Sequence, residues 1–386
     1  MIGFLKMGIG HYIAHLYPYL KKDYKLSVIS YTHGALGDKL IIDDEIIKEY
    51  VKNYKLVINP HGFKETFQST NELFEIFAKE SFDVLNLHVS AYTRLTSYIF
   101  IPVIEYFKSK RTKILYTIHD VIPFPEGGRV SAYLEYFYRL ADAAIVGNKQ
   151  EMEKLKKLFH FEGKIFVATH GIYNLFNRNR LNQSEARETL DLKKGQNAML
   201  FFGILRENKG LEDLIKAIYL LNQQGFKNVF LIIVLSLRSN ISFDRYNKLI
   251  KQNQLNSQIK IIIKDSSTIQ EIEMYFKAAD LVVLPYTAAS QSGILNLALA
   301  FEKPTIISNL FAETPYVNKK MGFVVDPKNP KMLAEKIKDF FRNKNALTKK
   351  FQANIFSYNK LHGFEQTATV YRLAFKSLLT PDEQKT

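Results

Sequence analysis

The sequence predicts an α/β protein built from two doubly wound, Rossmann-like parallel-sheet domains. Short, largely apolar segments alternate along the chain with longer segments of helical periodicity, a pattern typical of parallel strands covered by helices on both faces. The alternation occurs twice, on either side of a polar stretch between residues 174 and 195. The 386 residues are enough for two domains, each with its own core.

In the first half, the apolar segments with strand character lie at Lys25–Ser30, Tyr54–Asn59, Asp83–Val89, Lys113–His119, Ala143–Gly147 and Lys164–Thr169. Helical periodicity occurs between them, for example at Asn71–Lys79 and Ser131–Ala141.

The second half repeats this scheme. Strands are expected at Ala198–Gly203, Val229–Ser236, Ile259–Lys264, Leu281–Pro285, Thr305–Ser308 and Gly322–Asp326. Helices are expected at Gly210–Gln223, Ile269–Lys277, Ile294–Phe301 and Lys331–Asn343.

The domain boundary is expected near residue 180. Residues 177–184 are polar and lack apolar periodicity, as linkers do, and a short helix at Glu185–Leu190 follows them. Residues 359–379 read as one amphipathic helix. The expected organisation is therefore a domain over 1–180, a second over 181–358 and a terminal helix over 359–380.

The composition favours a soluble protein of the cytoplasm. Cysteine is absent, which excludes disulfides and thiolate chemistry. The N-terminus lacks the charged region and apolar core of a cleavable signal, and no window has the ~18 uninterrupted apolar residues of a membrane span.

A net charge of +15 indicates polyanionic partners such as anionic lipid, phosphorylated substrates or nucleic acid, unless it reflects only a lysine-rich surface. The first half holds basic clusters at 108–113 and 154–157 together with many aromatic residues. That combination suits an anionic membrane surface. Signatures of nucleic-acid binding are missing, so we expect no nucleic-acid partner.

Residues 280–304 carry the clearest functional signal. Asp280 precedes the apolar strand Leu281–Leu284, Pro285 stops it, and Ser290-Gln291-Ser292-Gly293 opens the next helix. A helix N-terminus presents unpaired N–H groups and partial positive charge, so it binds phosphate readily. This stretch predicts a phosphorylated or nucleotide-linked ligand.

A second candidate is the loop that follows the strand at 198–203. Gly203 allows a ligand to approach the backbone closely. Arg206 can bind a phosphate bidentately, and Lys209 adds a further positive charge. A phosphate site is favoured over a merely solvated basic loop because the same domain supplies the 290–293 turn.

Three histidines, His88, His119 and His170, each lie at the end of a predicted strand of the first half. His119 can hydrogen-bond a sugar hydroxyl or transfer a proton, or it can simply order the loop leading to Pro125. For His88 and His170 a structural role is favoured. Their spacing does not indicate a metal site.

The N-terminal segment Gly8-Ile9-Gly10-His11 resembles a helix-opening glycine turn and is a weaker candidate for a donor or acceptor contact. It lacks the full dinucleotide fingerprint. Pro18 is expected to end or kink the following helix early.

Taken in order, these motifs resemble glycosyltransferase family 4. In the second half the resemblance rests on Gly203…Arg206-x-x-Lys209-Gly210, Ala279–Pro285, Gly293…Lys303-Pro304, Glu313 and Gly322–Pro327. In the first half it rests on Ile118–Val121, Ala141–Val146 and His170-Gly171. The resemblance implies the GT-B fold, in which two such domains face each other across a cleft and the C-terminal helix crosses back to the first.

The resemblance also implies the roles of individual residues. Arg206, Lys209 and the amides around Ser290, Gln291, Ser292 and Gly293 would bind the donor diphosphate. Gly203, Lys264, Asp265 and Glu313 would lie near the sugar or nucleoside, and His119 would be the catalytic, sugar-side histidine. Family members are generally retaining, need no metal ion or other cofactor, and use a nucleotide-sugar as substrate.

The sequence departs from the family pattern at four positions. Two glutamates usual in the family are replaced by Ala289 and Leu297. The glycine usual before the Lys-Pro pair is Glu302, and the arginine usual directly after Gly203 is Ile204. Gln291 can take over sugar binding. The loss of both glutamates is also compatible with weak donor binding or an inactive copy.

The preferred function is a retaining, metal-independent hexosyltransferase that modifies a lipid-linked or polysaccharide acceptor, such as a lipopolysaccharide precursor, at the inner face of the plasma membrane. One alternative is a non-catalytic protein that binds nucleotide-sugars or glycans. Another is a nucleotide-sugar epimerase on the same scaffold.

Overall fold

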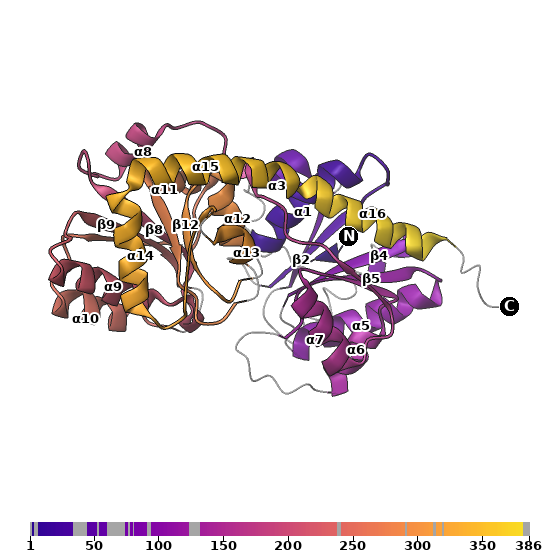
Figure 1. Ribbon diagram of the computed structural model, residues 1–386. Coiled ribbons are helices and arrows are strands. Elements are labelled where there is room, and N and C mark those ends of the chain that lie inside the picture. The colour runs from indigo at the N-terminus through magenta and orange to yellow at the C-terminus, as the bar shows by residue number, and fades with distance from the viewer. Residues whose placement is uncertain are drawn as a thin grey trace. The chain divides into compact units, whose positions relative to one another are not determined.

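The computed structural model consists of two compact α/β units and describes residues 2–3, 7–33, 45–51, 54–59, 74–75, 78–79, 81–90, 94–122, 132–237, 241–289, 292–311, 314–318 and 320–380 (Figure 1). Unit 1 contains Met1–Gly171 and His362–Thr386, and unit 2 contains Ile172–Leu361. The chain therefore passes from the first unit to the second earlier than residue 180, and it returns to the first unit at residue 362.

Unit 1 is a seven-stranded, wholly parallel sheet of order β3-β2-β1-β4-β5-β6-β7. Its strands are β1 (Ile2–Gly3), β2 (Val28–His33), β3 (Tyr54–Asn59), β4 (Val84–Ser90), β5 (Lys113–Asp120), β6 (Ala143–Val146) and β7 (Lys164–Val167). Its helices are α1 (Met7–Leu20), α3 (Glu45–Tyr50), α5 (Arg94–Ser109), α6 (Ala132–Arg139), α7 (Lys149–Phe159) and α16 (Phe364–Leu379).

Unit 2 is a six-stranded parallel sheet of order β10-β9-β8-β11-β12-β13. Its strands are β8 (Asn197–Ile204), β9 (Val229–Ser236), β10 (Ile259–Ile263), β11 (Leu281–Leu284), β12 (Thr305–Ser308) and β13 (Gly322–Val325). Its helices are η1 (Asn174–Phe176), α8 (Gln183–Thr189), η2 (Glu207–Lys209), α9 (Leu211–Gln223), α10 (Asp244–Gln252), α11 (Ile269–Ala278), α12 (Gly293–Ala300), α13 (Thr314–Val317), α14 (Pro330–Arg342) and α15 (Lys344–Leu361).

Each sheet has its own apolar core, as the sequence pattern predicts. In unit 1, strand residues such as Leu87 and Tyr116 pack with Phe107 of α5 and Phe159 of α7. In unit 2, every residue of β11 is fully buried. Strands that are apolar on both faces need cover on both faces, and the two sets of helices supply it.

Three local predictions were wrong. The first strand, Ile2–Gly3, was not expected, because two residues are too short to show an apolar pattern. Helix α1 continues through Pro18 to Leu20 instead of ending before the proline. The C-terminal segment is two helices and not one, since Gly363 interrupts the ladder and caps the start of α16.

The polar stretch around residue 180 is folded onto unit 2. The side chain of Asn177 donates to the carbonyl of Ala300 at 3.0 Å, and the amide of Arg180 donates to Glu273 at 3.0 Å. Asn182 and Glu185 form a capping box that starts α8. These polar residues bind backbone groups, so their lack of apolar periodicity does not mark a free linker.

In both units, an aspartate directly before a strand helps to set the register between that strand and its neighbour. Asp142 precedes β6, and its carboxylate accepts the amide of Ile114 at 2.6 Å. Asp280 precedes β11, and its carboxylate accepts the amide of Ala198 at 2.9 Å. In each case the backbone amide of the aspartate also donates to the carbonyl of the same partner residue. Side chain and backbone thus set one strand register together.

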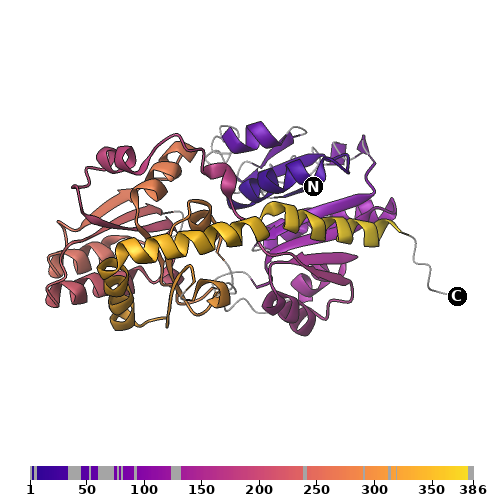
Figure 2. The same cartoon turned by 45° about the horizontal axis from the view of Figure 1, so that its top comes forward.

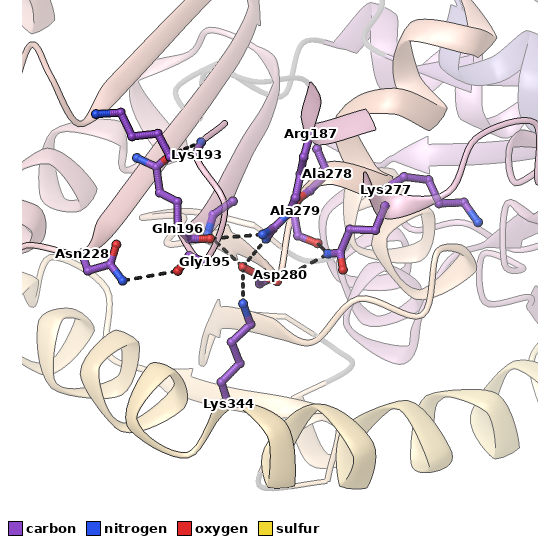
Figure 3. A network of polar contacts seen from close by, with 12 residues as sticks. Arg187, Lys193, Gly195, Gln196, Asn228, Lys277, Ala278, Ala279, Asp280 and Lys344 are labelled. Carbon is purple, nitrogen blue, oxygen red and sulfur yellow. Dashed lines mark hydrogen bonds and ion pairs between the residues drawn. The ribbon is translucent and has the colours of Figure 1, made fainter. Parts of the chain in front are cut away.

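Asp280 is the centre of a larger polar network (Figure 3). Its side chain is 6% exposed and accepts from Arg187 of α8 at 2.6 Å and from Lys344 of α15 at 2.8 Å. Nearby, the Lys303 ammonium donates to the carbonyl of Ala279 at 2.8 Å. Burial lowers the pKa of Lys303 to about 8. The network connects two helices to the centre of the sheet.

Replacing Asp280 with alanine is expected to lower the free energy of unfolding by about 3–5 kcal/mol, because two partly buried cations lose their shared carboxylate. Urea unfolding followed by circular dichroism measures this change. Asp191→Ala is the matched control: Asp191 pairs with Lys260 at 3.0 Å but its side chain is 89% exposed. A cost below about 1 kcal/mol for Asp280→Ala, as for an exposed pair, would show that the network does not anchor the unit.

Candidate functional site

The loops that follow β8 and β11 meet at the switch point of the second sheet. These two strands are neighbours, and the strand order runs in opposite directions on either side of them. In open α/β sheets, ligands bind at this point, outside the carboxyl ends of the strands. The two loops contain the candidates Gly203, Arg206 and Lys209 and the start of α12.

The two loops are hydrogen-bonded to each other. The amide of Thr287 donates to the carbonyl of Asn208 at 2.8 Å, and the side chain of Asn208 donates to the carbonyl of Ala288 at 2.8 Å. Gly210 has φ 68°, and a Cβ there would lie 1.9 Å from the carbonyl oxygen of Pro285. Only glycine fits this close approach, so the loops form one rigid edge.

The ammonium of Lys209 lies over the ring of Tyr286, 3.7 Å from its centroid. Tyr286 is 2% exposed, and its hydroxyl has no hydrogen-bond partner among the described residues. Among the residues that the structure describes, no carboxylate forms an ion pair with Lys209. The aromatic face therefore holds the lysine in place without neutralising its charge.

Arg206 lies at the start of η2 in extended conformation, and its side chain is exposed. Its backbone carbonyl accepts the amide of Lys209 at 3.1 Å. Within the described ranges, no ion pair involves its guanidinium. Both predicted phosphate-binding cations thus come from one short turn.

Helix α12 begins at Gly293, one residue before the predicted start, with Ser292 as its N-cap. A Cβ at Gly293 would lie 3.7 Å from the ring of Tyr173. Gly203 has φ 134°, and a Cβ there would also lie 3.7 Å from the side chain of Ile294. The end of β8 and the start of α12 are therefore adjacent, and partial positive charge develops at this terminus. Ser290 and Gln291 lie outside the described residues.

The proposed nucleoside contacts fall at the carboxyl end of β10. The amide of Lys264 donates to the carbonyl of Leu235, while its ammonium pairs with Glu271. The carbonyl of Asp265 accepts the hydroxyl of Ser236 at 3.1 Å. The side chain of Lys264, the amide of Lys264 and the carbonyl of Asp265 are thus all engaged within unit 2. Glu313 lies outside the described residues.

The three histidines of unit 1 form one cluster. His88 Nδ1 and His119 Nε2 are 3.3 Å apart, and the rings of His119 and His170 are 5.6 Å apart. The ring of Tyr12 contacts all three. The sequence treated these histidines separately. They meet because His88 and His119 lie near the carboxyl ends of β4 and β5 and His170 follows β7, and parallel strands end at the same edge.

The cluster is electrically neutral at ordinary pH. Burial lowers the pKa of His88 to about 3 and that of His170 to about 4, and it also holds the pKa of His119 well below its usual value. Each imidazole therefore carries one proton. A neutral His119 can donate one hydrogen bond and accept another.

The N-terminal glycine turn is not a loop. Gly8 and Gly10 lie in the first turn of α1, which starts at Met7, so the prediction of a turn before the helix was wrong. The carbonyl of His11 accepts a hydrogen bond from His15 at 2.7 Å. Glycines leave this helix start free of Cβ atoms at the switch point between β1 and β4.

The four positions at which the sequence resemblance implies a departure have distinct environments. Leu297 is 5% exposed inside α12, so an apolar residue there is buried in unit 2. Ala289 and Ile204 are half-buried. Glu302 follows α12 with φ 53°, a left-handed conformation that favours glycine. A glycine would adopt this backbone without strain, and Glu302 bears the strain.

Sequence reasoning missed Tyr286 and Asn208. Both have a signal in hindsight: Tyr286 directly follows the proline that ends β11, and Asn208 stands between the two predicted cations. Among the described residues, no group of three His, Asp or Glu side chains is arranged to hold a metal ion, and no helix is long and apolar enough to cross a bilayer.

Known proteins resemble this chain mainly in structure. A glycosyltransferase from Rickettsia africae superposes with a TM-score of 0.74 at 18% identity, covering 99% of this chain and 98% of that one. Anabaena HepE in complex with UDP-glucose gives 0.74 at 15% identity, covering 97% and 99%. Sucrose-phosphate synthase from Thermosynechococcus elongatus gives 0.72 at 17%, covering 97% and 95%.

By sequence, no curated protein matches the chain. Residues 182–358 match the family model described as "Glycosyl transferases group 1". This match covers most of unit 2, including both loops of the candidate site. Residues 182–358 thus match the glycosyl transferases group 1 family, and the whole chain has the GT-B fold of two parallel-sheet α/β domains seen in solved glycosyltransferases.

Proposed function

We propose that the protein is a glycosyltransferase that moves a sugar from a nucleotide-sugar donor to a lipid-linked or polysaccharide acceptor, with retention, in cell-surface glycan synthesis. The observation that carries this proposal is the pair of interlocked loops at the switch point of unit 2, which present Lys209, Arg206 and the start of α12 together. A concentration of positive charge at this place suits a diphosphate.

In the proposed reaction the bond between the sugar's anomeric carbon and the donor diphosphate breaks, and a bond to an acceptor oxygen forms. The acceptor's proton passes to the departing phosphate, and a nucleoside diphosphate is released. Lys209, Arg206 and the α12 amides stabilise the charge that develops on the leaving group. These groups supply positive charge without a metal ion.

The environments of Lys209 and His119 support a division of roles. Lys209 is held over an uncharged ring and lies at the loop proposed to bind the diphosphate. His119, the proposed sugar-side residue, is held neutral by burial, so it offers directional hydrogen bonds and not charge. The loss of the family glutamates at Ala289 and Leu297 favours one rival function, a protein that binds nucleotide-sugars without transferring them.

The deciding experiment incubates the purified protein with a panel of nucleotide-sugars, with and without membrane lipid extracts, and detects products by mass spectrometry. The transferase function predicts nucleoside diphosphate and a glycosylated lipid or glycan. Binding without release from any donor would support the non-catalytic function. Conversion of the donor sugar without an acceptor would indicate an epimerase.

Replacing Arg206 and Lys209 together with alanine is expected to lower the affinity for a nucleoside diphosphate by about a hundredfold, because each charged hydrogen bond contributes about 1.5–3 kcal/mol. Isothermal titration with UDP, GDP and ADP measures this loss. Lys216→Ala is the control, since Lys216 on α9 is exposed and pairs with Glu212. Unchanged affinity in the double variant would refute the phosphate assignment.

Tyr286→Leu is expected to weaken nucleoside diphosphate binding about tenfold, because the lysine ammonium loses its aromatic support. Tyr286→Phe keeps the ring and is expected to bind like the original protein. Equal weakening in both variants would assign the effect to the hydroxyl and not to the ring.

The histidine cluster predicts acid sensitivity. The unfolded chain takes up protons near pH 6.5, whereas folded His88 and His170 do so only near pH 3 and 4. The free energy of unfolding therefore falls as pH drops from about 6.5 to 4, by up to about 1.4 kcal/mol per pH unit for each histidine. His170→Gln is expected to reduce this slope by that amount, and His88→Gln/His170→Gln by twice as much. Urea unfolding at several pH values measures the slopes, and identical slopes would contradict the prediction.

A further inference from the structure

In unit 1, the C-terminal ends of the helices lie at the edge of the sheet where the parallel strands start, which we call the amino edge. Each helix between two parallel strands ends near the start of the next strand, so α1, α5, α6 and α7 all have their C-terminal ends at this edge. Helix α16 runs alongside α1 in the same direction: Phe364 contacts Tyr12, Arg372 bonds Asp23, and Phe375 contacts Tyr24 (Figure 2). Its C-terminal end therefore lies at this edge too.

This edge is strongly basic. Besides Arg139, which pairs with Glu135, eleven exposed basic residues lie at the described helix ends and strand starts there, and we call these eleven the basic rim: Lys21, Lys22, Lys25, Lys108, Lys110, Arg111, Lys113, Lys156, Lys157, Lys164 and Lys376. Asp83 and Glu162 are exposed acids at the same edge, but the basic rim outnumbers them, and two further acids there are engaged. Asp23 pairs with Arg372 at 2.6 Å, and Asp142 accepts the amide of Ile114 while lying 3.8 Å from Lys108.

The same edge carries the exposed apolar side chains of the unit. Among the described residues of unit 1, the exposed large hydrophobic side chains are Tyr136, Leu158, Leu373 and Leu379, which are 38–55% exposed. All four lie in the C-terminal halves of α6, α7 and α16. A groove of about 420 Å³ beside Leu373 and Leu379 is lined by Tyr24, Arg372 and Lys376.

We propose that the basic rim and these flanking side chains dock the protein on an anionic phospholipid bilayer. Leucines can enter the acyl boundary while lysines, on long flexible stems, reach the headgroup phosphates. Each lysine near such a surface contributes about 1 kcal/mol. Nucleic acid suits the surface less well: of these four side chains only Tyr136 offers a face on which a base can stack, whereas the three leucines can only enter an apolar layer.

The test needs no sugar donor, so its failure would leave the proposed transfer reaction standing. The full chain is sedimented with vesicles of phosphatidylcholine alone or mixed with phosphatidylglycerol. The proposal predicts binding only to the mixed vesicles, weakened by salt. Binding to neither kind of vesicle would overturn it.

Three variants locate the surface. Lys21→Glu/Lys22→Glu/Lys376→Glu is expected to lower the affinity for mixed vesicles about a hundredfold. Lys331→Glu/Lys349→Glu/Lys350→Glu reverses three exposed lysines of unit 2 and is expected to bind normally. Equal losses in both would assign binding to net charge and overturn the proposal.

Leu373→Ser/Leu379→Ser is expected to weaken vesicle binding while leaving binding to single-stranded RNA, a polyanion without acyl chains, unchanged. Thermal unfolding checks that each variant folds. If the leucine variant binds vesicles normally, and the lysine variant loses RNA and vesicle binding alike, the rim is a general polyanion surface and the bilayer proposal fails.

Discussion

The candidate site depends on the register between β8 and β11, which Asp280 helps to fix. The aspartate exchanges backbone and side-chain hydrogen bonds with Ala198 at the amino ends of the two strands. The contacts at the carboxyl ends of these strands depend on that register. Gly203 lies beside the first turn of α12, and the side chain of Asn208 donates to the carbonyl of Ala288. A slip of one residue would turn every side chain of β11 to the opposite face. The buried carboxylate of Asp280 thus helps to position the loops at the opposite ends of β8 and β11.

The sequence predicts the fold well because a parallel sheet converts chain position into spatial position. Apolar runs identify strands, strand ends share an edge, and so the amino-acid pattern alone places Gly203, Lys209 and Gly293 together. The contact between the Lys209 ammonium and the Tyr286 ring could not be predicted, because it depends on how two loops lie against each other. The extent of α1 beyond Pro18 was not predicted, because proline usually ends or kinks a helix. The break before α16 had a signal in Gly363 itself, since glycine is a weak helix former.

The histidine cluster shows how burial changes the meaning of a residue type. Read singly, His88, His119 and His170 are three residues with pKa values near neutrality. Brought together around Tyr12 and away from water, they behave as neutral hydrogen-bonding rings. The sequence predicts that each histidine lies at a strand end. Only the packed structure shows that the three rings lie together around Tyr12.

The length of β5 has a geometric consequence. The strand runs from Lys113, on the basic rim, to the end that carries His119, and its eight residues span roughly 25 Å. With the rim resting on a bilayer, the histidine edge stands that far above the headgroups. Under the proposed docking, an acceptor anchored in the bilayer would have to span that distance to reach the histidine edge.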